Sequence, residues 1–446
     1  MIKDRTDLMG RFIPDVLVDH LLLSDPLLEF TSAVVVNKTS IHCNRCGFNC
    51  EKTKCKLPNG IFYCPNCIEM GRIDTSMKLV TVPEANDFMI PPEILTWKGH
   101  LTAFQRDCAS KIITSVQHHR NHLLWAVTGA GKTEMLFPVL KWAIEHQKRI
   151  AIASPRVDVC SELYPRLQAA FSNLDMVLLH GKSKEQYRYC QLTICTTHQL
   201  MRFFHTFDLL IIDEVDAFPF VANVNLKFAV THARKRDGQT IMLSATPGIK
   251  LREKVIKEHG DVSYLPLRFH GHLLPQIKVH LSRNWRMKLT KKKLPKILIK
   301  MCQHNIAIGR RFLLFVPQIK DLAVIDQILQ KELRGKKAWD CVYSADSERM
   351  AKVQAMRDHD VLFLITTTIL ERGVTFPDID VMVLGADDPV FSTSSLVQIA
   401  GRVGRKKTRP TGNVDFFVGS YSRRIKRAQA EITIMNRKGK QLKDGK

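Results

Sequence analysis

The sequence predicts an α/β protein with two tandem parallel-sheet domains preceded by a small cysteine-rich module. Three observations support this fold class. From about residue 76, short apolar runs typical of buried strands alternate with helix-favouring segments, as parallel sheets require. Polar residues recur directly after these runs. Four cysteines in two close pairs precede the first run. At 446 residues the chain has room for roughly three domains of average size.

Composition and charge narrow the class of protein. Hydrophobic residues make up 45% of the chain and charged residues 25%, as in ordinary globular proteins. The formal net charge of +24 favours a polyanionic partner, either nucleic acid or an anionic membrane surface. No apolar run approaches the ~18 residues that a membrane-spanning helix needs, and the N-terminus lacks a signal-peptide core. We therefore expect a cytoplasmic protein that can still dock on a membrane protein.

An accessory segment, residues 1–39, comes first and carries no chemical signature. Residues 40–75 follow as a predicted zinc module. Its cysteines form two C-x2-C pairs separated by 17 residues: Cys43, Cys46, Cys64 and Cys67. This spacing is typical of a tetrahedral Zn²⁺ site, in which the metal supplies the folding energy of a module too small for its own core. Cys50 and Cys55 lie between the pairs and are either substitute ligands or spare thiols.

A phosphate-binding loop is predicted where the apolar run 123–127 meets a helix-favouring segment, 134–144. The spacing is Ala126-x4-Gly131-Lys132-Thr133. Glycines at 129 and 131 let the backbone N–H groups face phosphate oxygens. Lys132 would reach the β- and γ-phosphates and Thr133 would ligate Mg²⁺. The alternative is a glycine turn that only separates a strand from a helix, and the motifs in the rest of the chain decide between the two.

Polar clusters follow four more apolar runs of the first predicted sheet. They are Ser154-Pro155-Arg156, Thr196-Thr197, Asp213-Glu214-Val215-Asp216 and Ser244-Ala245-Thr246. Open α/β sheets bind ligands at the carboxyl ends of their strands. Asp213 is expected to hold Mg²⁺, directly or through water, and Glu214 to orient or deprotonate the attacking water. A solvated acidic turn is the plain alternative for this tetrad.

The second half repeats the α/β pattern, with predicted strands at 312–316, 361–365 and 381–384, and an amphipathic helix at 319–333. It lacks a second phosphate loop. Arg402 and Arg405 are predicted on one face of a helix, from which they would reach a phosphate across a domain cleft, unless they form a plain basic surface. The tail 423–446 holds nine Lys or Arg against two acids. It is either a nucleic-acid contact or a frayed end.

In their order, these motifs resemble those of superfamily 2 helicases and translocases over residues 100 to 420. The resemblance implies two RecA-like domains, at 76–270 and 271–446, the second including the basic tail. It also implies an ATP site formed by Gln105 (at the adenine), Thr128, Gly129, Ala130, Gly131, Lys132, Thr133, Asp213 and Gly373. Catalytic roles fall to Lys132, Asp213, Glu214, Arg402 and Arg405. Contacts to DNA are implied for Ser154, Pro155, Arg156, Thr196, Thr197, Thr367 and Thr368.

Within that superfamily the chain resembles the ComFA family, the late-competence ATPases of DNA uptake. The likeness rests on the four-cysteine module before the motor, Ser154-Pro155-Arg156-Val157-Asp158, and the segment Thr366–Thr375. It implies an ATP-dependent translocase on single-stranded DNA that drives uptake of transforming DNA. The implied cofactors are ATP, Mg²⁺ and Zn²⁺. The implied partners are single-stranded DNA, a membrane DNA channel at its cytoplasmic face and other competence proteins, which would place the protein at the inner side of the membrane.

Two other functions are weighed against this one. The first is a duplex-unwinding helicase of replication restart or repair, as in the PriA family. PriA is similar at 154–158 and 366–375 but places its cysteines within the second motor half. No strand-separating insertion is recognisable here, and the motif Asp213–Asp216 reads Asp-Glu-Val-Asp, not Asp-Glu-Ala-Asp as in RNA helicases. A non-catalytic zinc-dependent scaffold is disfavoured because Lys132, Thr133, Asp213 and Glu214 are all intact.

Overall fold

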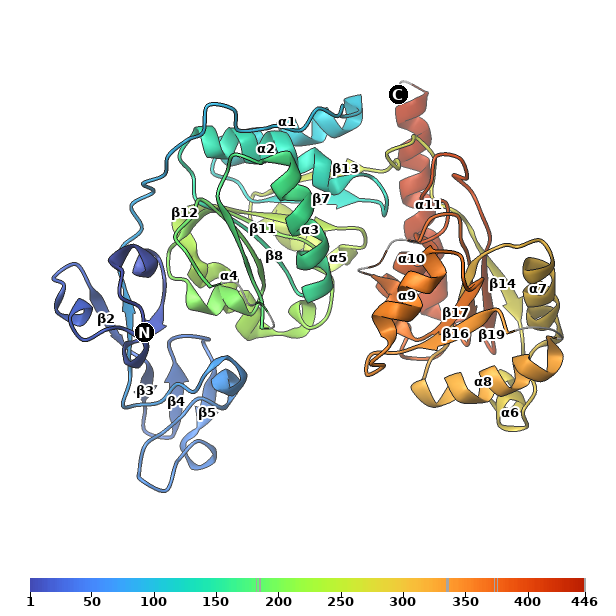
Figure 1. Ribbon diagram of the computed structural model, residues 1–446, viewed down its shortest axis with the longest axis horizontal. Coiled ribbons are helices and arrows are strands. Elements are labelled where there is room, and N and C mark those ends of the chain that lie inside the picture. Colours follow the sequence, from blue (N-terminus) through green and yellow to red (C-terminus); the bar gives the residue numbers. More distant parts are fainter. Residues whose placement is uncertain (182, 184–185, 334–336, 373, 375, 445–446) are drawn as a thin grey trace. The chain divides into compact units, whose positions relative to one another are not determined.

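The computed structural model describes residues 1–181, 183, 186–333, 337–372, 374 and 376–444. The chain divides into two compact units (Figure 1). The first comprises Met1–Trp125 and Thr133–Tyr264, and the second Ala126–Lys132 and Leu265–Lys446.

Two small antiparallel sheets make up the N-terminal part of the first unit, drawn in blue in Figure 1. In the described residues, one has the order β1 (Ile13–Pro14), β6 (Lys78–Thr81), β2 (Glu29–Ser32), and the other β3 (Val34–Val36), β4 (Ser40–Cys43), β5 (Asn49–Glu51). Phe30 pairs with Val80 in the first sheet. Residues on both sides of the predicted zinc module therefore share one sheet.

A seven-stranded sheet, counted over the described residues, forms the main body of the first unit. Its order is β13 (Asp261–Leu265), β7 (His122–Ala126), β12 (Arg234–Ser244), β11 (Phe207–Ile212), β8 (Ile150–Ser154), β10 (Leu192–Thr196), β9 (Met176–Leu179). Its helices are α1 (Ala103–Gln117), α2 (Lys132–Glu145), α3 (Val157–Ala170), α4 (Val224–Ala233) and α5 (Gly248–Lys257). Strands β7, β8 and β10 are buried along their whole length, as expected for parallel strands covered on both faces.

A six-stranded parallel sheet, again among the described residues, forms the second unit. Its order is β14 (Ile277–Leu281), β19 (Val414–Val418), β18 (Asp380–Leu384), β15 (Phe312–Phe315), β17 (Phe363–Thr366), β16 (Trp339–Val342). Its helices are α6 (Trp285–Thr290), α7 (Lys296–Ala307), α8 (Ile319–Glu332), α9 (Arg349–Arg357), α10 (Thr393–Ala400) and α11 (Arg423–Lys443). The two parallel sheets confirm the predicted fold class. The sequence predicts strands corresponding to β15, β17 and β18 but not β14, β16 or β19.

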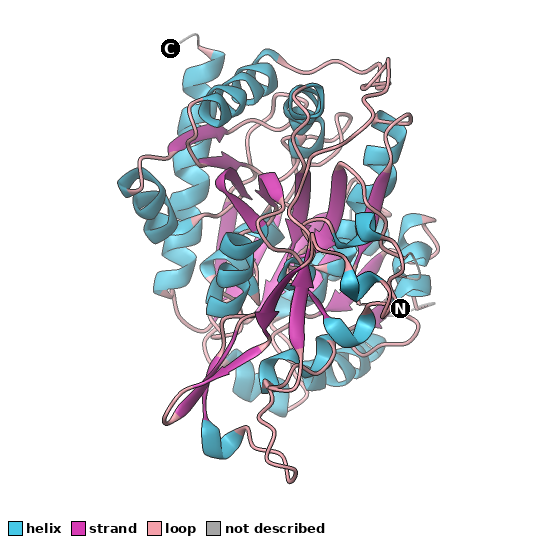
Figure 2. Ribbon diagram, turned by 90° about the vertical axis from the view of Figure 1, so that its left-hand side faces the viewer, coloured by secondary structure: helices cyan, strands magenta, loops and turns pink. Residues whose placement is uncertain are grey.

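Helix α11 corrects one reading of the basic tail. Its 21 residues form a continuous helix from the N-cap Ser422, whose side chain accepts a hydrogen bond from Ile425 N. One side is buried in the second unit and consists of Ile425, Ala428, Ile432, Met435, Asn436 and Gly439. The helix is the long one beside the C label in Figure 2. A frayed end is therefore wrong for residues 423–443.

The N-terminal residues are integrated into the first unit by buried polar contacts. The Arg149 guanidinium, fully buried, pairs with the Glu84 carboxylate and donates to Met9 O at 2.9 Å and to the Tyr187 hydroxyl at 2.6 Å. Backbone bonds join Phe12 N to Arg202 O at 2.7 Å. The accessory segment is thus part of the packed structure of this unit.

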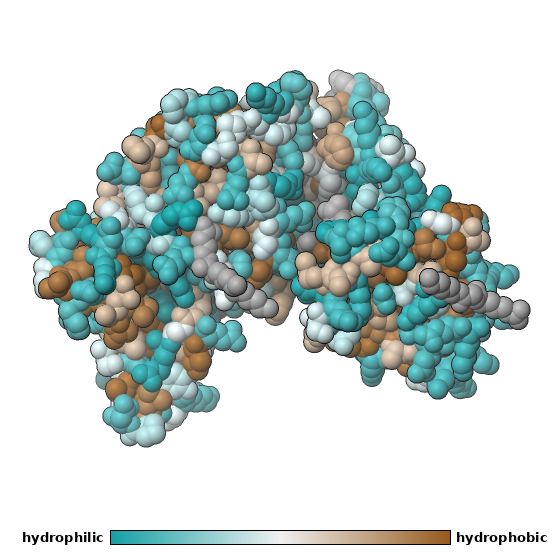
Figure 3. Space-filling model, in the orientation of Figure 1, coloured by the Kyte–Doolittle hydropathy of each residue, from teal (hydrophilic) through white to brown (hydrophobic). Residues whose placement is uncertain are grey.

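Hydrophilic residues predominate on the face shown in Figure 3, and brown apolar patches occur at the left, where the N-terminal segments lie. Leu21 and Phe30, both in the N-terminal segment, are exposed. Among the described residues, the search for a helix long and apolar enough to cross a membrane finds none.

Candidate nucleotide and metal sites

The four paired cysteines converge on one point. Their sulfur atoms all lie within 4.8 Å of one another, and the four side chains are buried. Cys43 Sγ lies 3.8 Å from Cys67 Sγ, and Cys46 Sγ lies 3.6 Å from Cys64 Sγ. Four buried thiols at this separation fit a tetrahedral Zn²⁺ site and would serve as its ligands. Within the described residues this cluster includes neither Cys50 nor Cys55, so the two intervening cysteines are not needed as substitute ligands.

Arg45 supports the cluster from within the first cysteine pair. It is almost fully buried, and its Nε donates to Cys67 Sγ at 3.4 Å. Its Nη2 donates to the carbonyls of Cys67 at 3.1 Å and Gly71 at 2.6 Å. Hydrogen bonds among the four thiols lower the pKa of Cys46 and Cys67 and raise the pKa of Cys43 and Cys64. The positive charge of Arg45 adds to the lowering at Cys67 and so favours its thiolate, the form that binds metal.

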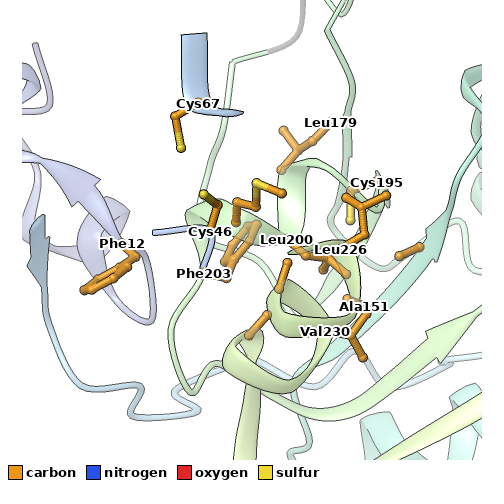
Figure 4. Close-up of a cluster of buried hydrophobic side chains, with 14 of the residues drawn as sticks. Phe12, Cys46, Cys67, Ala151, Leu179, Cys195, Leu200, Phe203, Leu226 and Val230 are labelled. Atoms are coloured by element: carbon orange, nitrogen blue, oxygen red, sulfur yellow. The ribbon is translucent and has the colours of Figure 1, made fainter. Parts of the chain in front are cut away.

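The cysteine cluster shares its hydrophobic core with the first parallel-sheet domain. Figure 4 shows Cys46 and Cys67 near Leu200 and Phe203, with Leu226 close by on α4. Asn225, also on α4, donates from Nδ2 to Cys46 O at 2.9 Å. The cysteine cluster is therefore packed against the helix that follows the acidic motif.

The phosphate loop connects β7 to α2 as predicted. Gly129 and Gly131 adopt φ values of +78° and +73°, which are accessible to glycine at little cost. Ala130 N donates to Val127 O at 3.2 Å and closes the turn. Lys132 and Thr133 begin the helix, so the loop presents its N–H groups at a helix N-terminus, where anions are favoured.

The acidic motif follows β11. Asp213 N donates to Ala153 O at 2.8 Å, and Asp213 Oδ1 accepts from Glu214 N at 2.9 Å. Glu214 has a left-handed backbone with φ of +55°. Such strain in a non-glycine residue concentrates at functional sites. Because β7, β12, β11 and β8 are parallel neighbours, the phosphate loop and the acidic motif leave the sheet at the same edge.

Asp216, the last acid of this motif, bridges two strand ends. Its Oδ1 accepts from Ser244 Oγ at 2.6 Å and its Oδ2 from Thr246 Oγ1 at 2.7 Å. Trp125 Nε1, on β7, donates to Ala245 O at 2.9 Å. The loop after β12 is thereby joined to the ends of both β11 and β7. Sequence reasoning gave Asp216 no role of its own.

Gln105 has a structural role at the start of α1. Its Oε1 accepts from Thr102 N at 2.8 Å, and Thr102 Oγ1 accepts from Gln105 N at 3.2 Å. This reciprocal pair is a capping box, and the spacing Thr-x-x-Gln indicates one. The expected adenine contact of Gln105 stays a prediction.

The residues predicted to contact DNA differ in accessibility. The side chains of Ser154, Thr196, Thr197 and Thr367 are buried. Arg156 and Thr368 are partly exposed. Arg156 and Thr368 can therefore contact DNA through their side chains. The four buried residues would contribute backbone groups.

Arg402 and Arg405 correct the predicted local structure. Helix α10 ends at Ala400, and both arginines lie in the turn that follows it, not on a helix face. Arg405 Nε donates to Gly401 O at 3.2 Å, while the Arg402 side chain is buried. Gly404, with φ of +72°, allows the chain to turn here. The positions of the two arginines are therefore set by this loop and not by the spacing of a helix.

Arg268 belongs to the same region of the second unit and was missed in the sequence. It is buried and donates from Nη1 to Gly404 O at 2.5 Å. Burial lowers its pKa to about 9, and the positive charge of Arg405 contributes in the same direction. Thr128, which groups with this unit, donates from Oγ1 to Gly401 O at 3.2 Å. Concentrated positive charge of this kind favours an anionic ligand.

The segment after β17 is described in part. Gly373, predicted to contact nucleotide, lies outside the described residues. Arg372 is buried and donates from Nη2 to Ser394 Oγ at 2.7 Å, and the Glu371 carboxylate accepts from Ser395 Oγ. Both contacts attach this segment to the first turn of α10.

Three family models match the chain in succession. The competence protein ComFA N-terminal domain matches residues 12–81, the DEAD/DEAH box helicase residues 102–254, and the helicase conserved C-terminal domain residues 290–407. Helicase domains of this kind support a superfamily 2 helicase-like ATPase with nucleic-acid binding, and they imply ATP and Mg²⁺. Thr133 and Asp213 offer the hydroxyl and carboxylate oxygens that Mg²⁺ prefers.

Solved structures show the same fold. The yeast protein S. cerevisiae Dbp5 bound to RNA and ADP BeF3 aligns with a TM-score of 0.53 at 16% identity, over 75% of this chain and 87% of that one. The DEAD-box helicase Mss116 bound to ssRNA and UDP-BeF aligns with a TM-score of 0.54 at 17% identity, over 71% of this chain and 69% of that one.

Two curated relatives match almost the full length. Competence protein ComFA of Bacillus subtilis (strain 168) is 38% identical over 94% of this chain and 92% of its own length. Competence protein ComFA of Streptococcus pneumoniae (strain ATCC BAA-255 / R6) is 40% identical over 98% of this chain and 99% of its own. With its cysteine cluster, two parallel-sheet domains and this likeness, the chain belongs to the ComFA family of competence proteins.

Proposed function

We propose that this protein is a single-stranded DNA translocase that uses ATP hydrolysis to drive uptake of transforming DNA. One observation carries the proposal: the phosphate loop and the acidic motif follow β7 and β11, two parallel strands of one sheet with only β12 between them, in a chain of the ComFA family. That arrangement suits nucleotide hydrolysis. The net charge of +24 suits a polyanion such as DNA.

In the proposed mechanism each residue has one task. Lys132 would neutralise the β- and γ-phosphates. Thr133 and Asp213 would hold Mg²⁺, which would supply stabilisation of negative charge on the phosphates. Glu214 orients the attacking water and accepts its proton. Arg402 and Arg405 stabilise charge on the transferred phosphoryl group.

DNA would act by favouring the state that hydrolyses ATP. A ligand shifts a conformational equilibrium only by its differential affinity for the two states, so DNA that binds the hydrolytic state more tightly raises turnover. Arg156 and Thr368 are the accessible members of the proposed DNA-contacting set. By family, the partners would be a membrane DNA channel and other competence proteins, with the protein at the cytoplasmic side of the membrane.

The test is steady-state ATP hydrolysis with and without single-stranded DNA. We expect strong stimulation by single strands, weaker stimulation by duplex, and near-complete loss in Glu214→Gln. Glu253→Gln, the same substitution at an exposed position on α5, is the matched control and should retain wild-type rates. Hydrolysis that ignores DNA or survives in Glu214→Gln would overturn the proposal.

Strand tracking is tested separately. On a partly double-stranded fork, a translocase without a separating element should leave the duplex intact, yet displace streptavidin from the end of a biotinylated single strand. Efficient release of the paired strand would instead make the protein an unwinding helicase of the PriA kind.

A further inference from the structure

Helix α11 carries a face rich in exposed cations. Five cations are exposed on it: Arg423, Lys426, Arg427, Arg437 and Lys440. Successive residues of an α-helix are rotated by about 100°, so these five positions fall within an arc of about 140° and extend over about 25 Å. The buried residues of α11 lie on the opposite side. We call these five residues the basic stripe.

The basic stripe contains no acid. The other exposed residues of α11 in the same arc are Ala430, Thr433 and Gln441, and the acid Asp444 follows only at the C-cap, beyond the last helical residue. No carboxylate among the described residues pairs with any of the five cations. Like charges three and four positions apart, as at Arg423, Lys426 and Arg427, repel one another on a helix. The arrangement therefore opposes helix stability unless an anion neutralises it.

The helix dipole adds to the electrostatic repulsion at the start of the stripe. Arg423, Lys426 and Arg427 lie in the first five residues of α11, at the end where backbone N–H groups already carry partial positive charge. The first turn contains no acid, whereas α2 and α3 have Glu134 and Asp158 there. Local choices that oppose stability are expected at functional sites.

An aromatic side chain begins the stripe. Tyr421 is 49% exposed and lies one residue before the N-cap Ser422. Lys426 Nζ lies 5.3 Å from the centre of the Tyr421 ring. An exposed aromatic ring beside a row of cations is the combination that binds single-stranded nucleic acid, by stacking on a base and neutralising phosphates.

We propose that the basic stripe and Tyr421 form a binding track for the phosphate backbone of single-stranded DNA. The inference rests on the proposed function in taking DNA as the ligand, and adds a site that the helicase motifs do not contain. An anionic membrane surface fits less well. A helix that lies on lipid exposes a large apolar face, whereas the apolar side of α11 is buried in the second unit.

The test is the salt dependence of DNA binding. Binding of a fluorescent oligo(dT) would be measured by anisotropy from 50 to 300 mM salt, roughly the range in which counterion release is visible. For single strands the slope of log affinity against log salt changes by about 0.7 per phosphate contact. The triple variant Arg423→Gln, Arg427→Gln, Arg437→Gln should therefore lower the slope by about 2.

The matched control removes the same charge elsewhere in the second unit. Lys291→Gln, Lys293→Gln and Lys296→Gln replace three exposed lysines near the start of α7 and should leave the slope unchanged. Tyr421→Ala should weaken binding without changing the slope, because stacking releases no counterions. The melting temperature of the stripe variant should not fall below wild type, since two of its cations oppose the helix dipole.

ATP hydrolysis separates this inference from the proposed function. The stripe variant should need at least tenfold more DNA for half-maximal stimulation at physiological salt, and reach the wild-type maximal rate. Equal salt slopes in the stripe variant and wild type would overturn the track while leaving a DNA-stimulated ATPase intact. If the stripe variant no longer sediments with phosphatidylglycerol vesicles but binds DNA as wild type does, the DNA track is also overturned and the stripe is assigned to lipid. Absence of any DNA stimulation in wild type would overturn the proposed function itself.

Discussion

The Asn225 side chain donates a hydrogen bond of 2.9 Å to the backbone carbonyl of Cys46. One partner lies on the helix after the acidic motif and the other in the cysteine cluster. A change in the cluster therefore reaches the first parallel-sheet domain through this hydrogen bond.

Loss of one cluster thiol should remove the metal. Cys46→Ser takes away a buried sulfur of the four-thiol site, so we expect less than one Zn²⁺ per chain by atomic emission, together with a lower melting temperature. Cys50→Ser is the control, because Cys50 lies outside the cluster, and should retain one Zn²⁺. Equal metal content in the two variants would contradict the assignment.

Gly47→Ala should loosen the knuckle from the domain. Gly47 has φ of +68°, and an added Cβ would lie 2.6 Å from the Phe228 ring on α4. Gly60, with φ of +83°, has nothing within 4 Å of such a Cβ. Both substitutions strain the backbone by about 1 kcal/mol, and only Gly47→Ala adds a clash. Urea unfolding should show a clearly larger loss for Gly47→Ala, and equal losses would refute the contact.

The buried ion pair should be one of the most sensitive points of the first unit. Glu84→Gln leaves the Arg149 guanidinium buried without its carboxylate, and we expect a loss of about 3–5 kcal/mol in unfolding free energy. Asp107→Asn breaks an exposed pair with Lys111 on α1 and should cost under about 0.5 kcal/mol. Similar losses in chemical denaturation would argue against a buried pair.

Stability should fall in mild acid through His122. Burial lowers the pKa of this side chain from 6.5 to about 4, and both ring nitrogens bond to serine hydroxyls, Ser115 and Ser263. As pH falls below 6.5 the unfolded chain binds a proton that the folded chain refuses until about pH 4. The contribution is thus complete above pH 6.5 and is lost between pH 6.5 and 4, by roughly 3 kcal/mol.

His122→Asn removes this titration and can still bond to a hydroxyl. The difference in unfolding free energy between wild type and this variant, followed by urea denaturation from pH 7.5 to 4.5, should shift in favour of the variant as pH falls. A difference that stays constant with pH would show that His122 does not titrate in this way.

The parts of the fold that the sequence predicts are those with a local signature. The phosphate loop is read from its glycines, the cysteine cluster from two short spacings, and the central strands from apolar runs that end in polar residues. Strand β14 escaped because its exposed and partly buried residues give no continuous apolar run. Arg402 and Arg405 were placed on a helix because their spacing fits one, whereas Gly404 turns the chain there.

Contacts between distant residues had no local signature. Glu84 and Arg149 are 65 positions apart, and neither residue type predicts burial, since charged side chains are seldom fully buried without a partner. Arg45 lies between two cysteines of the cluster, where the sequence would equally fit an exposed basic residue. The Thr102–Gln105 capping box is different. Its spacing is readable in the sequence, but it was interpreted through the family motif and not through helix-start chemistry.

The Glu84–Arg149 pair limits how members of this family could exchange parts. A chimera that took residues 1–101 from one relative and the motor from another would have to supply both charges, together with the contacts of Met9 and Tyr187 to the same guanidinium. A mismatch on either side would leave a charge sealed in the interior. In this chain the N-terminal region and the first parallel-sheet domain are thus physically interdependent.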